Sequence, residues 1–270
     1  MKPTLLILAA GMASRYGSMK QIDGFGPNGE TIIDYSIYDA INAGFGKVVF
    51  IIKQEFVDNF KSIFEPKLNG RIETEYVFQN FDLKQFGIEE EIYREKPWGT
   101  AHAILSGRNV IKEPFCVINA DDYYGFDAFK KMADFLNTEA TDSNYSIIGY
   151  EIGKTLSEFG SVSRGVCKVD ESGNLSEIIE RTKVYPKDGK IFYEEDGEEF
   201  PLDFSTPVSM NFWGFTPAVF KTTEDLFKEF ALANKDKPKA EFFIPLIGES
   251  LVQQGTATFK VVPTSNKCLV

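Results

Sequence analysis

The sequence contains very little histidine or cysteine and has no long apolar run. Its only histidine is His102, which argues against a histidine-based zinc site and against a catalytic triad with a histidine base. The three cysteines are an odd number without paired spacing, so we expect a reducing, cytoplasmic setting and no disulfide framework. No stretch approaches the roughly 20 apolar residues that cross a bilayer, so we expect no membrane partner.

Positive charge is also in short supply. The 270 residues include 29 Lys and Arg against 40 Asp and Glu, a net charge of -11. A general nucleic-acid binder normally presents a basic face, so we expect no nucleic-acid partner. A small phosphorylated ligand remains compatible with this charge, because it meets one local loop and not the average surface.

In the first half of the chain, short apolar runs alternate with amphipathic stretches. The expected strands are 3–9, 48–52, 72–78, 115–118 and 145–150, and the expected helices lie near 33–44, 55–64, 100–108 and 126–136. This alternation predicts right-handed βαβ units and a Rossmann-like α/β fold, with a mostly parallel sheet flanked by helices.

After about residue 155 the pattern changes to short alternating segments around Gly173, Gly189 and Gly197, which indicate hairpins. A strand at 206–215, helices at 218–233 and 241–254, and a last strand at 257–262 follow. We therefore expect one domain over 1–270, with halves 1–155 and 156–270 and a β-rich lobe inserted in the second half. The sequence stops in apolar residues, which suggests a truncated C-terminus.

The turn after the first expected strand has the composition of a phosphate loop. It comprises Leu8, Ala9, Ala10, Gly11, Met12 and Ala13, followed by Arg15, Gly17, Lys20 and Gln21. Small residues let backbone N–H groups approach a ligand closely, while Arg15 can grip a phosphate as a fork and Lys20 acts as a point charge. The loop is neither a Walker A loop nor a dinucleotide fingerprint. An ordinary strand–loop–helix with two solvated cations is the alternative.

Two acids, Asp121 and Asp122, follow the strand expected at 115–118. Ligands of open α/β sheets gather at the carboxyl ends of strands. A carboxylate there can hold Mg²⁺ against phosphate oxygens. The alternative is an Asp-rich turn or a helix cap.

With these residues in place, the chain resembles the sugar-nucleotide pyrophosphorylases, a family of nucleotidyltransferases. The run LAAGxxxRxGxxKQ is similar to the family's signature, and segments 98–103, 119–122 and 178–183 agree in order and rough spacing. The resemblance covers residues 4 to about 262.

The resemblance implies a role for each segment. Arg15 and Lys20 would be catalytic, Asp121 would hold the metal, and Asp122 would lie in an outer shell. The nucleotide would meet Leu8, Ala9, Ala10, Gly11, Met12, Ala13, Arg94, Gly99 and Thr100, and the sugar phosphate would meet Gly160, Glu180, Lys183 and Asn211. Many relatives carry Gln where this chain has Arg94. Because arginine only donates hydrogen bonds, the identity of the base stays open.

The resemblance further implies a Mg²⁺-dependent enzyme that joins a nucleoside triphosphate to a sugar 1-phosphate, glucose 1-phosphate above all, and releases pyrophosphate. It also implies a second metal ligand about ten residues beyond Pro263, for which Asn266 is a poor substitute, and it suggests homo-oligomers. The alternatives are a cytidylyltransferase acting on phosphocholine or a polyol phosphate, and a catalytically silent, nucleotide-binding regulatory homologue.

Overall fold

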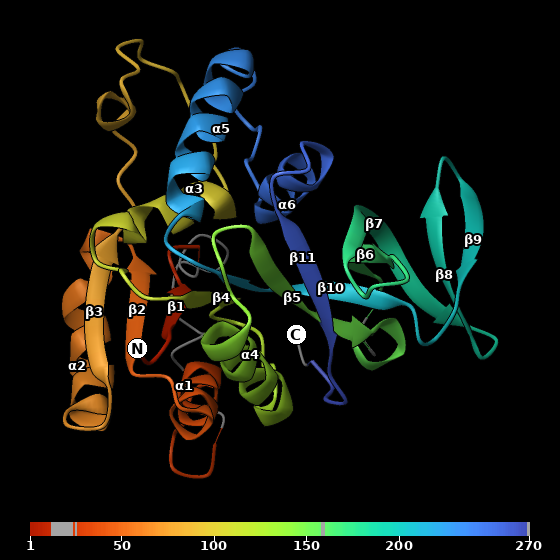
Figure 1. Cartoon of the computed structure of the whole chain (residues 1–270), viewed down its shortest axis with the longest axis horizontal. Helices are drawn as coiled ribbons and strands as arrows, with labels where there is room; N and C mark the ends of the chain where they lie inside the picture. The colour runs from red at the N-terminus through yellow and green to blue at the C-terminus, as the bar shows by residue number, and fades with distance from the viewer. Residues whose placement is uncertain (12–23, 25, 158–159, 269–270) are drawn as a thin grey trace.

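The computed structural model describes residues 1–11, 24, 26–157 and 160–268, and it has three layers, with helices on both faces of one large sheet (Figure 1). The strand order along the sheet is β3-β2-β1-β4-β10-β6-β7-β8-β9, with β5 against β10 and β11 against β5. The predicted Rossmann-like α/β class, a mixed sheet with a large parallel part, is confirmed.

The larger parallel part, among the described residues, consists of four strands from the first half of the chain. They are β3 (Glu73–Phe78), β2 (Lys47–Ile52), β1 (Thr4–Leu8) and β4 (Phe115–Asn119). All six residues of β2 are buried, as expected for a strand covered on both faces. Leu8 at the end of β1 lies opposite Ile51 of β2 and Asn119 of β4, so these strands end at one edge of the sheet.

Within the described residues, six helices cover the two faces. Helices α1 (Ile32–Ala43), α2 (Val57–Leu68) and α4 (Phe126–Thr138) enclose one apolar core. Helices α3 (Thr100–Leu105), α5 (Val219–Ala233) and α6 (Ile244–Gln253) enclose the other. Short 3-10 turns lie at Gln54–Phe56, Leu83–Phe86, Ser106–Asn109 and Ile152–Lys154.

Helix α1 shows how local sequence sets these bounds. Thr31 and Asp34 form a reciprocal capping box at its start, and Gly44 ends it with a φ of 101°. This left-handed conformation favours glycine, so the predicted glycine stop is confirmed.

Strand β10 (Pro207–Phe215) joins the two halves of the sheet. It runs antiparallel to β4, to β5 (Asn144–Glu151) and to β6 (Val162–Val169). The register of β10 against β5 shifts between Ser209 and Trp213, which marks an irregularity within the strand. Strand β11 (Thr258–Pro263) pairs in parallel with β5.

The β-rich lobe expected after residue 155 is present. Strand β7 (Leu175–Lys187) pairs with β6 along its first part and with β8 (Lys190–Glu195) along its last part, and β9 (Glu198–Leu202) closes the hairpin. The β8–β9 hairpin projects away from the layered body (Figure 1). In the part of the chain that the structure describes, no helix has both the length and the apolar character needed to span a membrane.

Candidate functional site

The ends of β1 and β4 bring two predicted site segments together. The backbone N–H of Ala9 donates to the Ile51 carbonyl (2.9 Å), and that of Ala120 donates to the Leu8 carbonyl (3.3 Å). The backbone therefore stays hydrogen-bonded for one residue beyond the end of β1 and of β4. Gly11 and Asp121 then leave the same sheet edge from neighbouring strands, and both are exposed. This edge, at the carboxyl ends of parallel strands, is where open α/β sheets bind ligands.

Four predicted residues of the phosphate loop, Met12, Ala13, Arg15 and Lys20, lie outside the described residues. Leu8 and Ala10 are half-buried and Ala9 is buried. The described part of the loop therefore leads from the core to the surface within three residues.

The two acids after β4 have different environments. Asp121 is exposed, whereas Asp122 is only 5% exposed. Asp122 accepts hydrogen bonds from the Asn119 amide (2.9 Å) and the Tyr124 hydroxyl (3.2 Å). Burial and the charge of Asp121 raise the pKa of Asp122 to about 6, against the opposing effect of these hydrogen bonds and Arg164. Asp121 is therefore the carboxylate that can reach a ligand, whereas the Asp122 carboxylate is held by hydrogen bonds within the turn after β4.

Asn211 lies in the irregular part of β10, beside this turn. Its φ is 66°, a left-handed conformation that asparagine tolerates better than most residues. Its side-chain amide donates to the Asn119 carbonyl oxygen (2.8 Å). The structure thus brings the predicted sugar-binding residue Asn211 to the end of β4, where it bonds the residue two positions before the predicted metal ligand Asp121.

Glu180 on β7 lies two strands away from β10. It pairs with Gly165 of β6, which pairs with Ser209 of β10, a separation of about 10 Å at the usual strand spacing. The side chain is open to solvent. Partial burial nevertheless raises the pKa of the Glu180 carboxyl, and attraction to Arg164 lowers it. Gly160, the other predicted residue of this region, is exposed and has a φ of 141°.

Lys183, predicted to hold the sugar phosphate, is already paired in the structure. Its ammonium lies 2.5 Å from Glu194 of β8, and its φ is 50°. The neighbouring cation Arg181 pairs with Glu195 and lies over the ring of Tyr193. Because the Lys183 pair is exposed, it stabilises the fold little and a phosphate could compete for it.

The segment around the start of α3 has a packing role that the sequence did not reveal. A Cβ on Gly99 would lie 2.5 Å from the Phe242 carbonyl oxygen, and the φ of Gly99 is 100°. The Thr100 hydroxyl accepts from the Ile244 N–H (3.2 Å) at the start of α6. Arg94 stacks on Trp98 and donates to the Lys237 and Ala240 carbonyls. Segment 237–244 thus docks on all three residues, and their nucleotide-binding role stays a prediction.

His102 is a core residue of α3. It is 1% exposed, its Nδ1 lies 3.0 Å from the Gln79 amide, and the rings of Phe81, Phe86 and Phe227 surround it. Burial lowers the pKa of His102 to about 3, and the charge of Arg108 adds to this. The imidazole is therefore neutral in the folded chain at neutral pH.

This burial makes stability depend on pH. Between pH 6.5 and 3 the unfolded chain binds a proton at His102 that the folded chain excludes, so the free energy of unfolding falls as the pH falls. We expect wild type to lose about 2.5 kcal/mol more than a His102→Gln variant between pH 7 and pH 4.5. Urea unfolding of both proteins at the two pH values measures this difference, in which effects of the acids largely cancel. Equal losses in the two proteins would contradict the assignment.

The last described residues cap α4. Asn266 accepts from the backbone N–H of Asp127 (2.9 Å), while Thr264 and Ser265 bond the Asp127 carboxylate. The Asn266 side-chain oxygen is thereby committed to the helix, which agrees with its low suitability as a metal ligand.

The donor set near Asp121 fits a magnesium ion that is shared with a substrate. Mg²⁺ usually takes one or two carboxylates together with substrate phosphates and waters. Asp121 offers an exposed carboxylate oxygen, and among the described residues no group of three or more His, Cys, Asp or Glu is placed to enclose a metal. A bound ion would therefore rely on oxygens of the ligand for much of its coordination.

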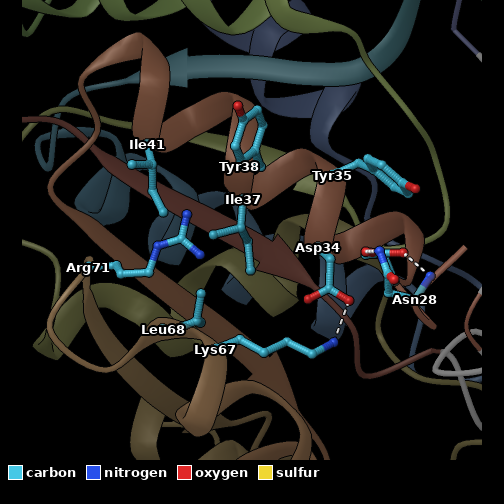
Figure 2. Close-up of a pocket in the computed structure, with 10 residues that line it drawn as sticks. Asn28, Asp34, Tyr35, Ile37, Tyr38, Ile41, Lys67, Leu68 and Arg71 are labelled. Atoms are coloured by element: carbon cyan, nitrogen blue, oxygen red, sulfur yellow. Dashed lines mark hydrogen bonds and ion pairs between the residues drawn. The ribbon is translucent and has the colours of Figure 1, made fainter. Parts of the chain in front are cut away.

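A separate cavity of about 510 Å³ lies between α1 and the end of α2 (Figure 2). Ile37, Ile41 and Leu68 line it, together with Arg71 and the Asp34–Lys67 ion pair (2.7 Å). None of the predicted site residues that the structure describes lines this cavity.

Sequence reasoning missed two residues of the site. Tyr124 is fully buried, and its hydroxyl lies within hydrogen-bond distance of Asp122 and of the Met210 carbonyl. Arg164 is 6% exposed and donates to the oxygens of Thr155 and Ser163. The sequence does not show that the Tyr124 hydroxyl reaches Met210, 86 positions away, or that the Arg164 side chain is buried.

Solved structures with the same fold include three relevant examples. The inositol-1-phosphate CTP transferase from T. maritima has a TM-score of 0.61 at 14% identity, over 99% of this chain and 88% of that one. A candidate glucose-1-phosphate thymidylyltransferase from Bacillus anthracis, in complex with a sucrose, gives 0.60 at 15%, over 98% and 88%. A UDP-glucose pyrophosphorylase complexed with UDP-glucose gives 0.57 at 17%, over 97% and 90%.

No curated protein sequence matches the chain significantly. The family model described as nucleotidyl transferase, however, matches residues 6–247. That match begins in β1 and ends in α6, so it includes both the β1–β4 edge and the β6–β10 lobe. Because this match covers most of the chain, the protein belongs to the nucleotidyl transferase family and is a nucleotidyltransferase.

Proposed function

We propose that this enzyme transfers a nucleotidyl group from a nucleoside triphosphate to a sugar 1-phosphate, glucose 1-phosphate in the first instance, with Mg²⁺ as cofactor. One observation carries the proposal. The small-residue turn after β1 and the exposed carboxylate of Asp121 after β4 leave neighbouring parallel strands at one edge of the sheet.

The reaction needs no covalent enzyme intermediate. An oxygen of the sugar phosphate attacks the α-phosphorus in line, forming a new P–O bond. The bond from the α-phosphorus to the bridging oxygen breaks, and pyrophosphate leaves with the electron pair. A phosphate monoester is already a competent nucleophile near neutral pH, so the enzyme's task is positioning and charge stabilisation.

On the nucleotide side, in residues 1–155, the loop 8–13 would hold the triphosphate by its backbone N–H groups. Arg15 and Lys20 would neutralise charge on the α-phosphate and the departing pyrophosphate. Asp121 would hold Mg²⁺, which when bound neutralises charge on the phosphate oxygens.

On the acceptor side, in residues 156–270, Glu180 would accept hydrogen bonds from sugar hydroxyls. The Lys183 ammonium would leave Glu194 and bind the sugar phosphate instead, since an exposed ion pair of this kind is weak. Asn211 and the backbone at Gly160 would complete the sugar contacts.

A polyol phosphate is the second candidate acceptor. The similarity in fold to the inositol-1-phosphate CTP transferase favours it, and the engagement of Arg94 with the 237–240 carbonyls leaves the base unspecified. A cyclic polyol and a sugar present similar rings of hydroxyls to Glu180.

A pyrophosphate-release screen with Mg²⁺ tests the proposal. Five triphosphates (ATP, CTP, GTP, UTP and dTTP) are each combined with glucose 1-phosphate, inositol 1-phosphate or phosphocholine. We expect release with glucose 1-phosphate and one or two of the triphosphates. Release only with inositol 1-phosphate or phosphocholine would favour the cytidylyltransferase alternative. Nucleotide binding without any release would favour a catalytically silent homologue.

A further inference from the structure

A closed set of hydrogen bonds joins the turn after β4 to the irregular part of β10. Asn119 stands at its centre: its side-chain amide donates to Asp122 (2.9 Å), and its side-chain oxygen accepts from Asn211 (2.8 Å). Its backbone N–H donates to the Tyr124 hydroxyl (2.9 Å). Asn119 thus contacts both the predicted metal turn and the predicted sugar strand.

Tyr124 closes the set from the core side. Its hydroxyl is 3.0 Å from the Met210 carbonyl and 3.2 Å from Asp122, so its single proton can serve either acceptor. Its ring packs against Phe212 and Phe129. The hydroxyl therefore links the residue before Asn211 to the residue after Asp121, within the buried interior.

This arrangement fixes a backbone that would otherwise have alternatives. Asn211 has a left-handed φ of 66° inside a strand, where the extended conformation is the usual one, so its contacts help to select this conformation. The Asn119 contact on its side chain and the Tyr124 contact on the preceding carbonyl are those contacts. Asn119 and Tyr124, from which these contacts come, lie two residues before and three residues after Asp121.

We propose that Asn119 and Tyr124 are positioning residues that hold the Asp121 turn and the Asn211 strand in one fixed relation, so that the metal side and the sugar side of the site form a single unit. The inference rests on the proposed function for the identity of the two sides. Neither residue need touch a substrate, because each acts through Asp122, Met210 or Asn211.

Matched tyrosine variants test this role. Tyr124→Phe removes the hydroxyl and keeps the ring. Tyr145→Phe is the control, because Tyr145 is also buried (2% exposed) and its hydroxyl also donates to a backbone carbonyl, that of Asp142 (3.0 Å). We expect both variants to fall in Tm, Tyr124→Phe further because its hydroxyl has three hydrogen-bond partners. Only Tyr124→Phe should weaken Mn²⁺ binding and turnover, each by about 10-fold, the scale of changes in residues that support a metal site. Mn²⁺ binding is measured in the presence of each triphosphate, from the change in water-proton relaxation when protein is added, because a bound ion would share its coordination with the substrate's oxygens.

A double-mutant cycle between Asn119→Ala and Asn211→Ala supplies a readout that general loss of packing does not. If the two side chains act as one unit, the double variant should lose no more Mn²⁺ affinity and turnover than the more damaged single variant. Multiplicative losses would overturn the proposal, as would equal Mn²⁺ affinity in Tyr124→Phe and Tyr145→Phe or the lack of Mn²⁺ binding to wild type.

These outcomes separate the inference from the proposed function. A wild type that binds Mn²⁺ but releases no pyrophosphate with any sugar phosphate refutes the function, while the tyrosine pair still decides the role of Tyr124. An active wild type whose two tyrosine variants behave alike refutes the inference and leaves the function standing.

Discussion

An Asp121→Asn variant is expected to lose Mg²⁺-dependent turnover by a factor on the order of 100 or more while remaining folded. The amide keeps the shape of the side chain but removes the charge that would hold the metal, and losses of this size follow when electrostatic stabilisation of a transition state is removed. Because Asp121 is exposed, the free energy of unfolding should change by about 0.5 kcal/mol or less. Steady-state pyrophosphate release and urea unfolding measure the two effects.

Asp236→Asn is the matched control, since Asp236 is an exposed aspartate beyond α5 and apart from the β1–β4 edge. It should turn over like wild type. Comparable activity in Asp121→Asn and Asp236→Asn would remove Asp121 from the metal site. A collapse of both stability and activity in Asp121→Asn would instead assign it a structural role in the turn.

Arg15→Ala is expected to reduce turnover by 100- to 1000-fold, roughly the range for loss of one preorganised group facing developing charge. The arginine is proposed to stabilise the α-phosphate and the departing pyrophosphate, so the fall should appear mainly in kcat. Single-turnover kinetics with saturating triphosphate separate the chemical step from nucleotide binding.

Arg71→Ala controls for loss of a positive charge, because Arg71 is an exposed arginine at the α1–α2 cavity (Figure 2). It lies just before the start of β3, and so at the opposite end of the parallel strands from the β1–β4 edge. The variant should leave turnover unchanged. Near-wild-type turnover in Arg15→Ala would defeat the proposal that the turn after β1 is a triphosphate cradle.

Much of the fold follows from local patterns in the sequence. The buried runs became β1, β2 and β4, and the capping box at Thr31 with Gly44 set the ends of α1. At the end of α3 the structure differs slightly from the expectation: the helix expected at 100–108 stops at Leu105 and continues as a 3-10 turn. Each of these features depends on residues close together in the chain, which is why the sequence reveals them.

The candidate site was less readable, because its geometry comes from distant partners. Asp121 and Glu180 were named from a motif. The sequence did not indicate that Asn211 would adopt a left-handed φ, or that a tyrosine would join Met210 to Asp122. The docking of Phe242 on Gly99 likewise spans more than 140 positions. Such contacts leave no periodic signal along the chain.

The placement of β10 has a consequence for how the chain is made. Until residues 207–215 emerge from the ribosome, the outer edge of β4 has no neighbour, and β5 has neither of its two partners, β10 and β11. Open edges of apolar strands are templates for pairing with other chains. The nascent first half thus exposes three aggregation-prone edges. Strand β10 can cover the outer edge of β4 and one edge of β5 after roughly sixty further residues, synthesised at about 5–20 residues per second, and β11 can cover the other edge of β5 roughly fifty residues later.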